Sequence, residues 1–230
     1  MDRMIQTPLN PLFFLLLLLL PLFLGILFIN VISISFAKLG FPPSLAFVLL
    51  FGSLIGSFIN IPITELETEG NVLSYKPSTR LWFLPQPVVE RRIVRTVIAA
   101  NVGGAVIPVL ISVFLIVKFP QMFIPIVIGT TICVVVSYTF SKPIPGMGIA
   151  MPVFLAPLTS AVVAVVLSIL FPETMRTVIA YTSGVLGVLI GADLLNLGKI
   201  KKLGAPTASI GGAGTFDGIF LTGILAVLLV

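Results

Sequence analysis

Long runs of apolar residues dominate the chain. Seven of them cover about 9–37, 43–63, 93–117, 121–139, 149–171, 174–197 and 213–230. Roughly twenty apolar residues in a helix span the ~30 Å hydrocarbon core of a bilayer. Runs such as 160–171 are apolar on every side, whereas strands of membrane barrels alternate apolar with polar residues. The pattern predicts an all-α fold, a polytopic membrane bundle of about seven transmembrane helices forming one integral membrane domain over residues 1–230.

The first apolar run is longer than the core of a signal peptide, which has about 7 to 15 residues. It also contains Pro21 and Gly25. We therefore expect it to be a retained membrane helix rather than a cleaved signal.

Positive charges divide unequally between the two ends of these predicted helices. One side holds ten lysines and arginines, namely Arg3, Lys76, Arg80, Arg91, Arg92, Arg95, Lys142, Lys199, Lys201 and Lys202. The other side holds three, namely Lys38, Lys118 and Arg176. Because cytoplasmic loops carry the excess of basic residues, this distribution predicts a multi-pass protein of the cell membrane with a cytoplasmic N-terminus and an external C-terminus.

One long cytoplasmic loop, over about 64–92, is expected between the second and third helices. In it Glu65, Glu67 and Glu69 recur at period two, which predicts a short strand with one charged face. Residues 72–75 or 80–84 are candidate partners for it in a hairpin. The glutamates are either a solvated strand edge or a docking edge for an extended peptide or a cation.

Composition narrows the possible chemistry. The chain is 58% hydrophobic and 9% charged, has no histidine, and has a single cysteine, Cys133. Histidine-dependent nucleophiles, histidine-ligated metal sites and intrachain disulfides are therefore excluded. The net charge of +5 follows from membrane orientation, so we expect no nucleic-acid partner. We also expect no cofactor and no metal.

Two acidic residues, Asp193 and Asp217, lie inside apolar segments. An ionised side chain near the bilayer centre costs ~2.5 to 3.5 kcal/mol, so such residues usually face a protein interior and mark functional sites. The sixth and seventh predicted helices form a hairpin closed on the cytoplasmic side. Both carboxyl groups are therefore expected at a similar depth on facing helices.

Two carboxyl groups in one low-dielectric site share a single proton, because both cannot ionise readily. The ionised member can activate water as a base, and the protonated member can protonate a leaving amine. Asp193 and Asp217 are thus candidate catalytic residues for peptide hydrolysis without histidine or metal.

The segment between the two aspartates is rich in glycine. Gly211, Gly212, Gly214, Thr215 and Phe216 lie just before Asp217. Exposed N–H groups at the start of the seventh helix can hold an anion or a peptide carbonyl, which makes these five residues candidate substrate-binding residues. The alternative is a small-residue packing surface between helices.

Three strings in the chain resemble a prokaryotic family of multi-pass proteins known as a domain of unknown function. These are GADLLN at 191–196, SIGGAGTFDGIF at 209–220 and PGMGI at 145–149. The resemblance covers most of the chain from about Phe51 onward, and it implies no established activity.

The layout of the aspartates also resembles that of intramembrane aspartyl proteases of the presenilin, signal-peptide-peptidase and prepilin-peptidase type. In those enzymes the second aspartate sits in a Gly-x-Gly-Asp motif. Here Gly214 and Asp217 match this motif, whereas Phe216 replaces the second glycine, and Ala192 precedes the first aspartate where tyrosine is common. The resemblance implies that Asp193 and Asp217 cleave a transmembrane peptide.

Three functions remain open for these aspartates. They form a protease dyad, they bind a proton or cation in a transporter or channel, or they join two helices of a non-catalytic scaffold. Membrane lipid is an expected partner in each case, and a transmembrane peptide or protein substrate is expected in the first.

Overall fold

The computed structural model describes residues 11–77, 85–144, 148–200, 207–212 and 218–230, with all their side chains except those of 11–13, 66, 68–77, 85–94 and 200. The α-helices are α1 (Pro11–Lys38), α2 (Pro43–Gly56), α3 (Ile107–Lys118), α4 (Phe123–Phe140), α5 (Leu155–Leu170), α6 (Arg176–Val188), α7 (Leu197–Ile200) and α8 (Gly218–Leu229). Short π-helical turns form η1 (Val102–Val106) and η3 (Leu189–Asp193), and 3-10 turns form η2 (Pro120–Met122) and η4 (Leu194–Asn196). The strands are β1 (Asn60–Pro77), β2 (Pro85–Asn101), β3 (Lys142–Ile144), β4 (Gly148–Ala150) and β5 (Thr207–Ile210).

Each predicted apolar segment contains one apolar helix. Three of these helices are long and apolar enough to cross a membrane, namely Phe14–Lys38, Pro120–Phe140 and Arg176–Lys199. The other four, Pro43–Gly56, Val102–Lys118, Leu155–Leu170 and Gly218–Leu229, are shorter. The helical bundle is thus as predicted, while seven membrane crossings stay a prediction.

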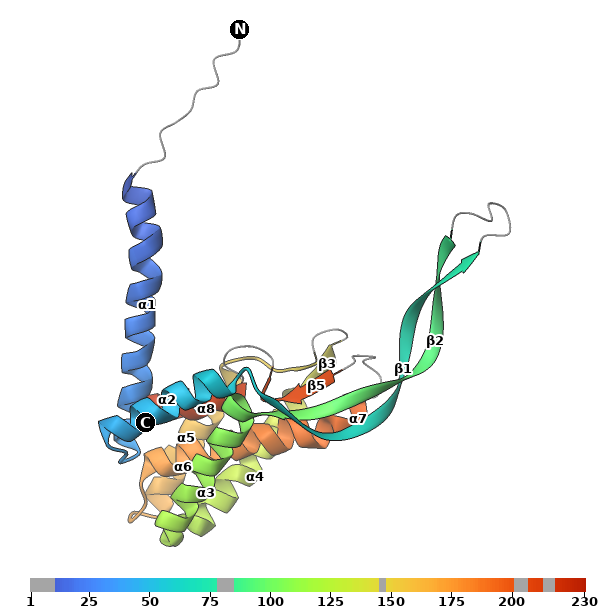
Figure 1. The fold of residues 1–230 in the computed structure, drawn as a ribbon. Helices are drawn as coiled ribbons and strands as arrows, with labels where there is room; N and C mark the ends of the chain where they lie inside the picture. Colours follow the sequence, from blue (N-terminus) through green and yellow to red (C-terminus); the bar gives the residue numbers. More distant parts are fainter. Residues whose placement is uncertain (1–10, 78–84, 145–147, 201–206, 213–217) are drawn as a thin grey trace.

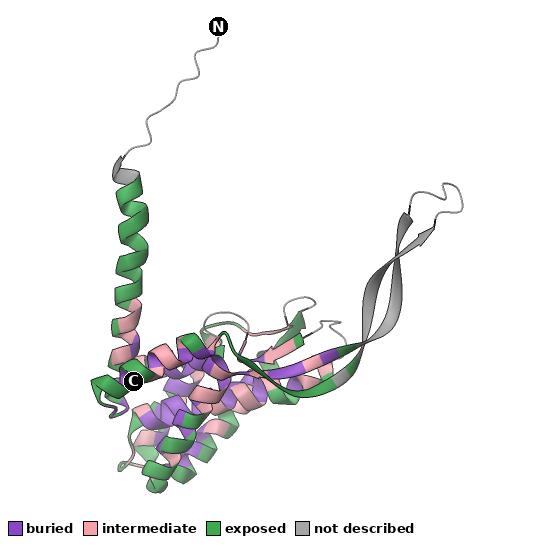
Figure 2. Cartoon of the chain, viewed as in Figure 1, coloured by how far each residue is buried: buried purple, intermediate pink, exposed green. Residues whose placement is uncertain are grey.

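The α6 helix is the centre of the bundle. In the most apolar part of the span Arg176–Lys199, which begins with α6, 67% of the residues are buried, against 28% in the span Pro120–Phe140, which contains α4. Tyr181, Ile179 and Val185 on α6 are completely buried. Figure 2 shows the buried residues gathered where the helices meet and exposed residues around them. An exposed rim of large apolar side chains, such as Ile124 and Phe154, is typical of a surface that faces lipid.

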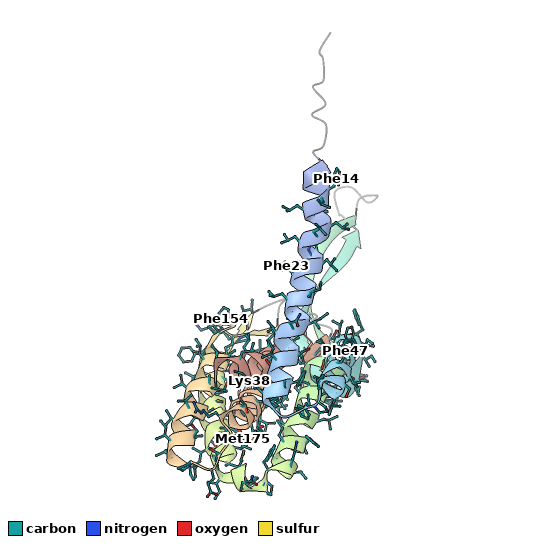
Figure 3. All side chains as sticks on the ribbon, turned by 90° about the vertical axis from the view of Figure 1, so that its left-hand side faces the viewer. Phe14, Phe23, Lys38, Phe47, Phe154 and Met175 are labelled. Carbon is teal, nitrogen blue, oxygen red and sulfur yellow. The ribbon has the colours of Figure 1, made fainter. Side chains whose placement is uncertain are left out.

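Helix α1 is packed only at its C-terminal end. There Ser35 Oγ donates to the Ile224 carbonyl of α8 at 3.3 Å, and Lys38 Nζ donates to the Val227 carbonyl at 3.4 Å. A lysine at the last carbonyls of a helix also interacts favourably with the helix dipole. The other end of α1, from Phe14 to Leu27, is exposed and stands away from the other helices (Figures 1 and 3). This apolar, unpacked end has the character of a helix surrounded by lipid.

A long β-hairpin replaces the short one predicted in the 64–92 loop. The strand over Glu65, Glu67 and Glu69 is confirmed, but β1 continues through 72–75 and pairs with β2 from Asn60↔Asn101 to Pro77↔Pro85. The proposed pairing with 72–75 is therefore wrong, and the other proposed partner, 80–84, lies outside the described residues. With 18 residues in β1, the hairpin extends for about 55 Å away from the helices (Figure 1).

The sheet has a third strand that an all-α prediction omits. β5 pairs in parallel with the base of β2, from Val97↔Thr207 to Ala100↔Ile210, giving the order β1-β2-β5. A second, two-stranded sheet joins β3 and β4. The fold is therefore a helical bundle with a hairpin arm, and β5 attaches the base of that arm to the segment that precedes α8.

Candidate functional site

Asp193 lies at the end of the central helix, where the helix changes from α to π geometry. It is the last residue of η3, which continues α6 directly, and its side chain is half-buried. The change of geometry follows Val188, and the chain then passes through the 3-10 turn η4 into α7. Single π turns inside helices are frequent at functional sites. The π turn at Asp193 is therefore a structural reason, besides its apolar context in the sequence, to consider this residue a functional candidate.

Glycines bring α6 and η3 very close to α4. The contacts that a Cβ atom at each glycine would make are Gly129 with Ser183, Gly187 with Cys133, and Gly191 with Ser137. Each step of four residues along one helix matches a step of four along the other. The two helices therefore run parallel in one register, and Gly191 seats η3 against α4 two residues before Asp193.

A buried asparagine binds the backbone of the π turn η3. Asn196, fully buried, donates from Nδ2 to the carbonyls of Gly191 at 3.1 Å and Ala192 at 2.9 Å. We predict from sequence that the asparagines in or near the spans only join helices. Asn196 instead binds the backbone of its own segment, directly beside Asp193, a role that the sequence gives no signal for.

Two of the predicted substrate-binding residues, Gly211 and Gly212, pack at the base of the hairpin, against η1 and β5, and not against η3. Gly211 has a φ of +71° and packs against the backbone and side chain of Ala105 in η1. A Cβ atom on Gly212 would overlap Ser209 Oγ. Both glycines thus have a packing role, which agrees with the alternative of a small-residue packing surface. They place the residues that follow β5 against η1.

A polar cluster at the base of the hairpin holds β5 in place. Asn60 Oδ1 accepts from Ser209 Oγ at 2.6 Å and from Asn101 Nδ2 at 3.1 Å. Asn101, which is 1% exposed, also donates to the Ser57 carbonyl and accepts from the Gly104 amide, capping η1. The cluster therefore ties β1, β2, β5, α2 and η1 together immediately before the segment with the second aspartate.

The remaining predicted site residues, Gly214, Thr215, Phe216 and Asp217, lie outside the described residues. Helix α8 begins at Gly218 and crosses α6 where Gly184 meets Thr222 and Gly223 meets Tyr181. That crossing is nine residues before Asp193, about 13 Å along the helix. Within the described part of the chain no three side chains of the types His, Cys, Asp or Glu lie together as a metal site.

No curated protein and no solved structure matches the chain. The resemblance to a family of multi-pass proteins is confirmed by a family model. The model described as "Protein of unknown function (DUF1614)" matches residues 54–229 and includes Asp193, Asn196, β5 and the segment up to α8. Because this match covers well over half of the sequence, the chain belongs to the DUF1614 family.

Proposed function

We propose that this protein is an intramembrane aspartyl peptide hydrolase in which Asp193 and Asp217 act on a membrane-embedded peptide. The observation that carries the proposal is the position of β5, an outer strand of the β1-β2-β5 sheet, between the two aspartates in the chain. An outer strand binds an extended peptide through main-chain hydrogen bonds. Binding in this form frees a peptide bond from the internal hydrogen bonds of a helix, which hydrolysis requires.

The chemistry follows from two carboxyl groups that share one proton. The ionised aspartate removes a proton from water, and the resulting hydroxide adds to the peptide carbonyl carbon. The protonated aspartate donates its proton to the departing nitrogen as the C–N bond breaks. A low-dielectric surrounding keeps one member protonated, because two adjacent negative charges are costly there. Asp193, half-buried at the end of the most buried span, has such a surrounding.

Proximity of the two aspartates is the first requirement of this proposal. Cysteines replacing Asp193 and Asp217, in a Cys133→Ala background, are expected to be joined by a bifunctional thiol reagent spanning about 10 Å, the largest separation of cooperating carboxylates in glycosidases. The measurement is the mass of the fragments after proteolysis between the two positions. A matched control pairs position 193 with Leu229→Cys, at the opposite end of α8. The dyad is contradicted if the 193–217 pair does not cross-link, or if both pairs cross-link to the same extent.

The proposed topology has seven spans, a cytoplasmic N-terminus and an external C-terminus in the cell membrane. The parallel register of α4 and α6 supports it, since alternate helices of such a bundle point the same way. Reporter fusions at Lys76 and Lys202 are expected to give cytoplasmic signals, and a fusion after Val230 an external one. An external signal at Lys202 would overturn both the topology and the shared depth of the aspartates.

Binding of a proton or cation by the same aspartates is a second candidate function. The favouring observation is the π turn at Asp193, because irregular backbone inside a membrane helix commonly lines an ion pathway. Under this function purified protein in vesicles is expected to show Asp193-dependent ion flux and no cleavage of membrane peptides. Membrane lipid surrounds the bundle under either function, and no nucleic acid takes part.

A further inference from the structure

The π turn η3 changes the direction in which Asp193 points. An α-helix advances by about 100° per residue, so one extra residue in a turn rotates every following side chain by about that angle. The preceding part of the helix, α6, cannot rotate in compensation, because Gly187 seats it directly on Cys133 of α4. The π turn is therefore what sets the direction of Asp193 relative to the packed bundle.

Asn196 is the side chain that holds this turn. Its two donated hydrogen bonds end on the carbonyls of Gly191 and Ala192, both inside η3. No donor among the described residues reaches its Oδ1 atom, so these two bonds are what orient the amide. The bonds reach back five and four residues from Asn196, so both end on carbonyls of the π turn rather than on another helix.

Loss of this amide leaves two buried carbonyl groups without a side-chain donor. A buried polar group without a partner is destabilising, and the backbone then gains from closing an ordinary α-helical turn. In an uninterrupted α-helix the amides of residues 195 and 196 would take these two carbonyls, and a return of η3 to that geometry removes its extra residue and rotates Asp193 by about 100°. We infer that Asn196 is a positioning residue, which holds η3 in π geometry so that Asp193 faces its reaction partner. This inference rests on the proposed function for the role of Asp193, but the orientation it describes is measurable separately.

The test compares Asn196→Ala with Asn30→Ala. Asn30 is a matched control, because its Nδ2 also donates to the carbonyl four residues before it, Ile26, but on exposed α1. Orientation is read in a Cys133→Ala, Asp193→Cys background as the rate at which a small thiol reagent labels position 193. We expect Asn196→Ala to change that rate at least tenfold and Asn30→Ala to leave it within twofold. Asn196→Ser, which keeps one shorter donor, is expected to fall between them and serves if the alanine variant does not accumulate.

Hydrolysis gives the second reading, on protein with Asp193 intact. Asn196→Ala is expected to lower cleavage of a membrane peptide at least tenfold and to displace its pH profile, since a rotated Asp193 no longer couples to the same partner. An unchanged labelling rate, or a lowered cleavage rate with an unchanged pH profile, overturns the positioning role. If the parent protein cleaves nothing, the proposed function fails, while the labelling rates still decide whether Asn196 sets the direction of position 193.

Discussion

Replacing Asp193 or Asp217 by asparagine is expected to lower peptide cleavage by about 10³-fold or more, because acid–base catalysis by positioned side chains contributes roughly 10²- to 10⁴-fold. Asparagine has nearly the volume of aspartate but neither accepts nor donates the catalytic proton. The measurement is the appearance of fragments from a tagged transmembrane peptide incubated with purified protein in vesicles. Each variant is expected to accumulate in the membrane at the parent level.

Glu173→Gln is the matched control for this experiment. Glu173 is an exposed acid between α5 and α6, so the same change of carboxylate to amide there is expected to leave cleavage unaltered. Loss of cleavage in the Glu173 variant would show an effect of charge rather than of the dyad. Retention of cleavage in either aspartate variant contradicts the proposed mechanism. If both variants instead alter ion flux, the second candidate function is supported, and unchanged behaviour in both assays leaves a scaffold.

The helices were predictable because each apolar run is long enough to specify one helix. The positions at which two of these helices end or begin were not predictable in this way. The segments 43–63 and 93–117 overrun α2 and α3, since Ile61, Ile63 and 97–100 are apolar and continue the hydrophobic runs. In the structure these residues belong to the base of the hairpin. Hydrophobicity alone does not separate a buried strand from the end of a membrane helix, which is why the sheet was underestimated.

The candidate site was predictable only in part. Asp193 was found because a charge inside an apolar segment is costly, and this signal needs no knowledge of the fold. The π turn depends on close packing against α4, and the pairing of β5 with β2 joins residues more than a hundred positions apart. Neither leaves a local pattern. The same holds for Asn60, Asn101 and Ser209, whose cluster forms only when the hairpin closes onto β5.

Close packing of α4 on α6 is expected to make Gly187 difficult to replace. A Cβ atom at position 187 would overlap the Cβ of Cys133 and approach the α4 backbone, so Gly187→Leu must separate the two helices. Overpacking of a well-packed core typically costs about 1 to 3 kcal/mol and occasionally more. We expect a cost at or above the upper end, because the obstacle includes the rigid backbone of α4. The measurement is the free energy of unfolding in mixed detergent micelles.

Gly25→Leu is the control for this prediction, because a Cβ atom on Gly25 meets nothing within 4 Å and the helix around it is exposed. It is expected to leave the free energy of unfolding nearly unchanged. A second arm exchanges the two partners: Cys133→Gly removes the obstacle, so the double variant Cys133→Gly, Gly187→Ala is expected to be more stable than Gly187→Ala alone. Such a favourable coupling arises only between residues in contact. Additive effects of the two substitutions would contradict the α4–α6 register, and with it the seating of η3 that directs Asp193.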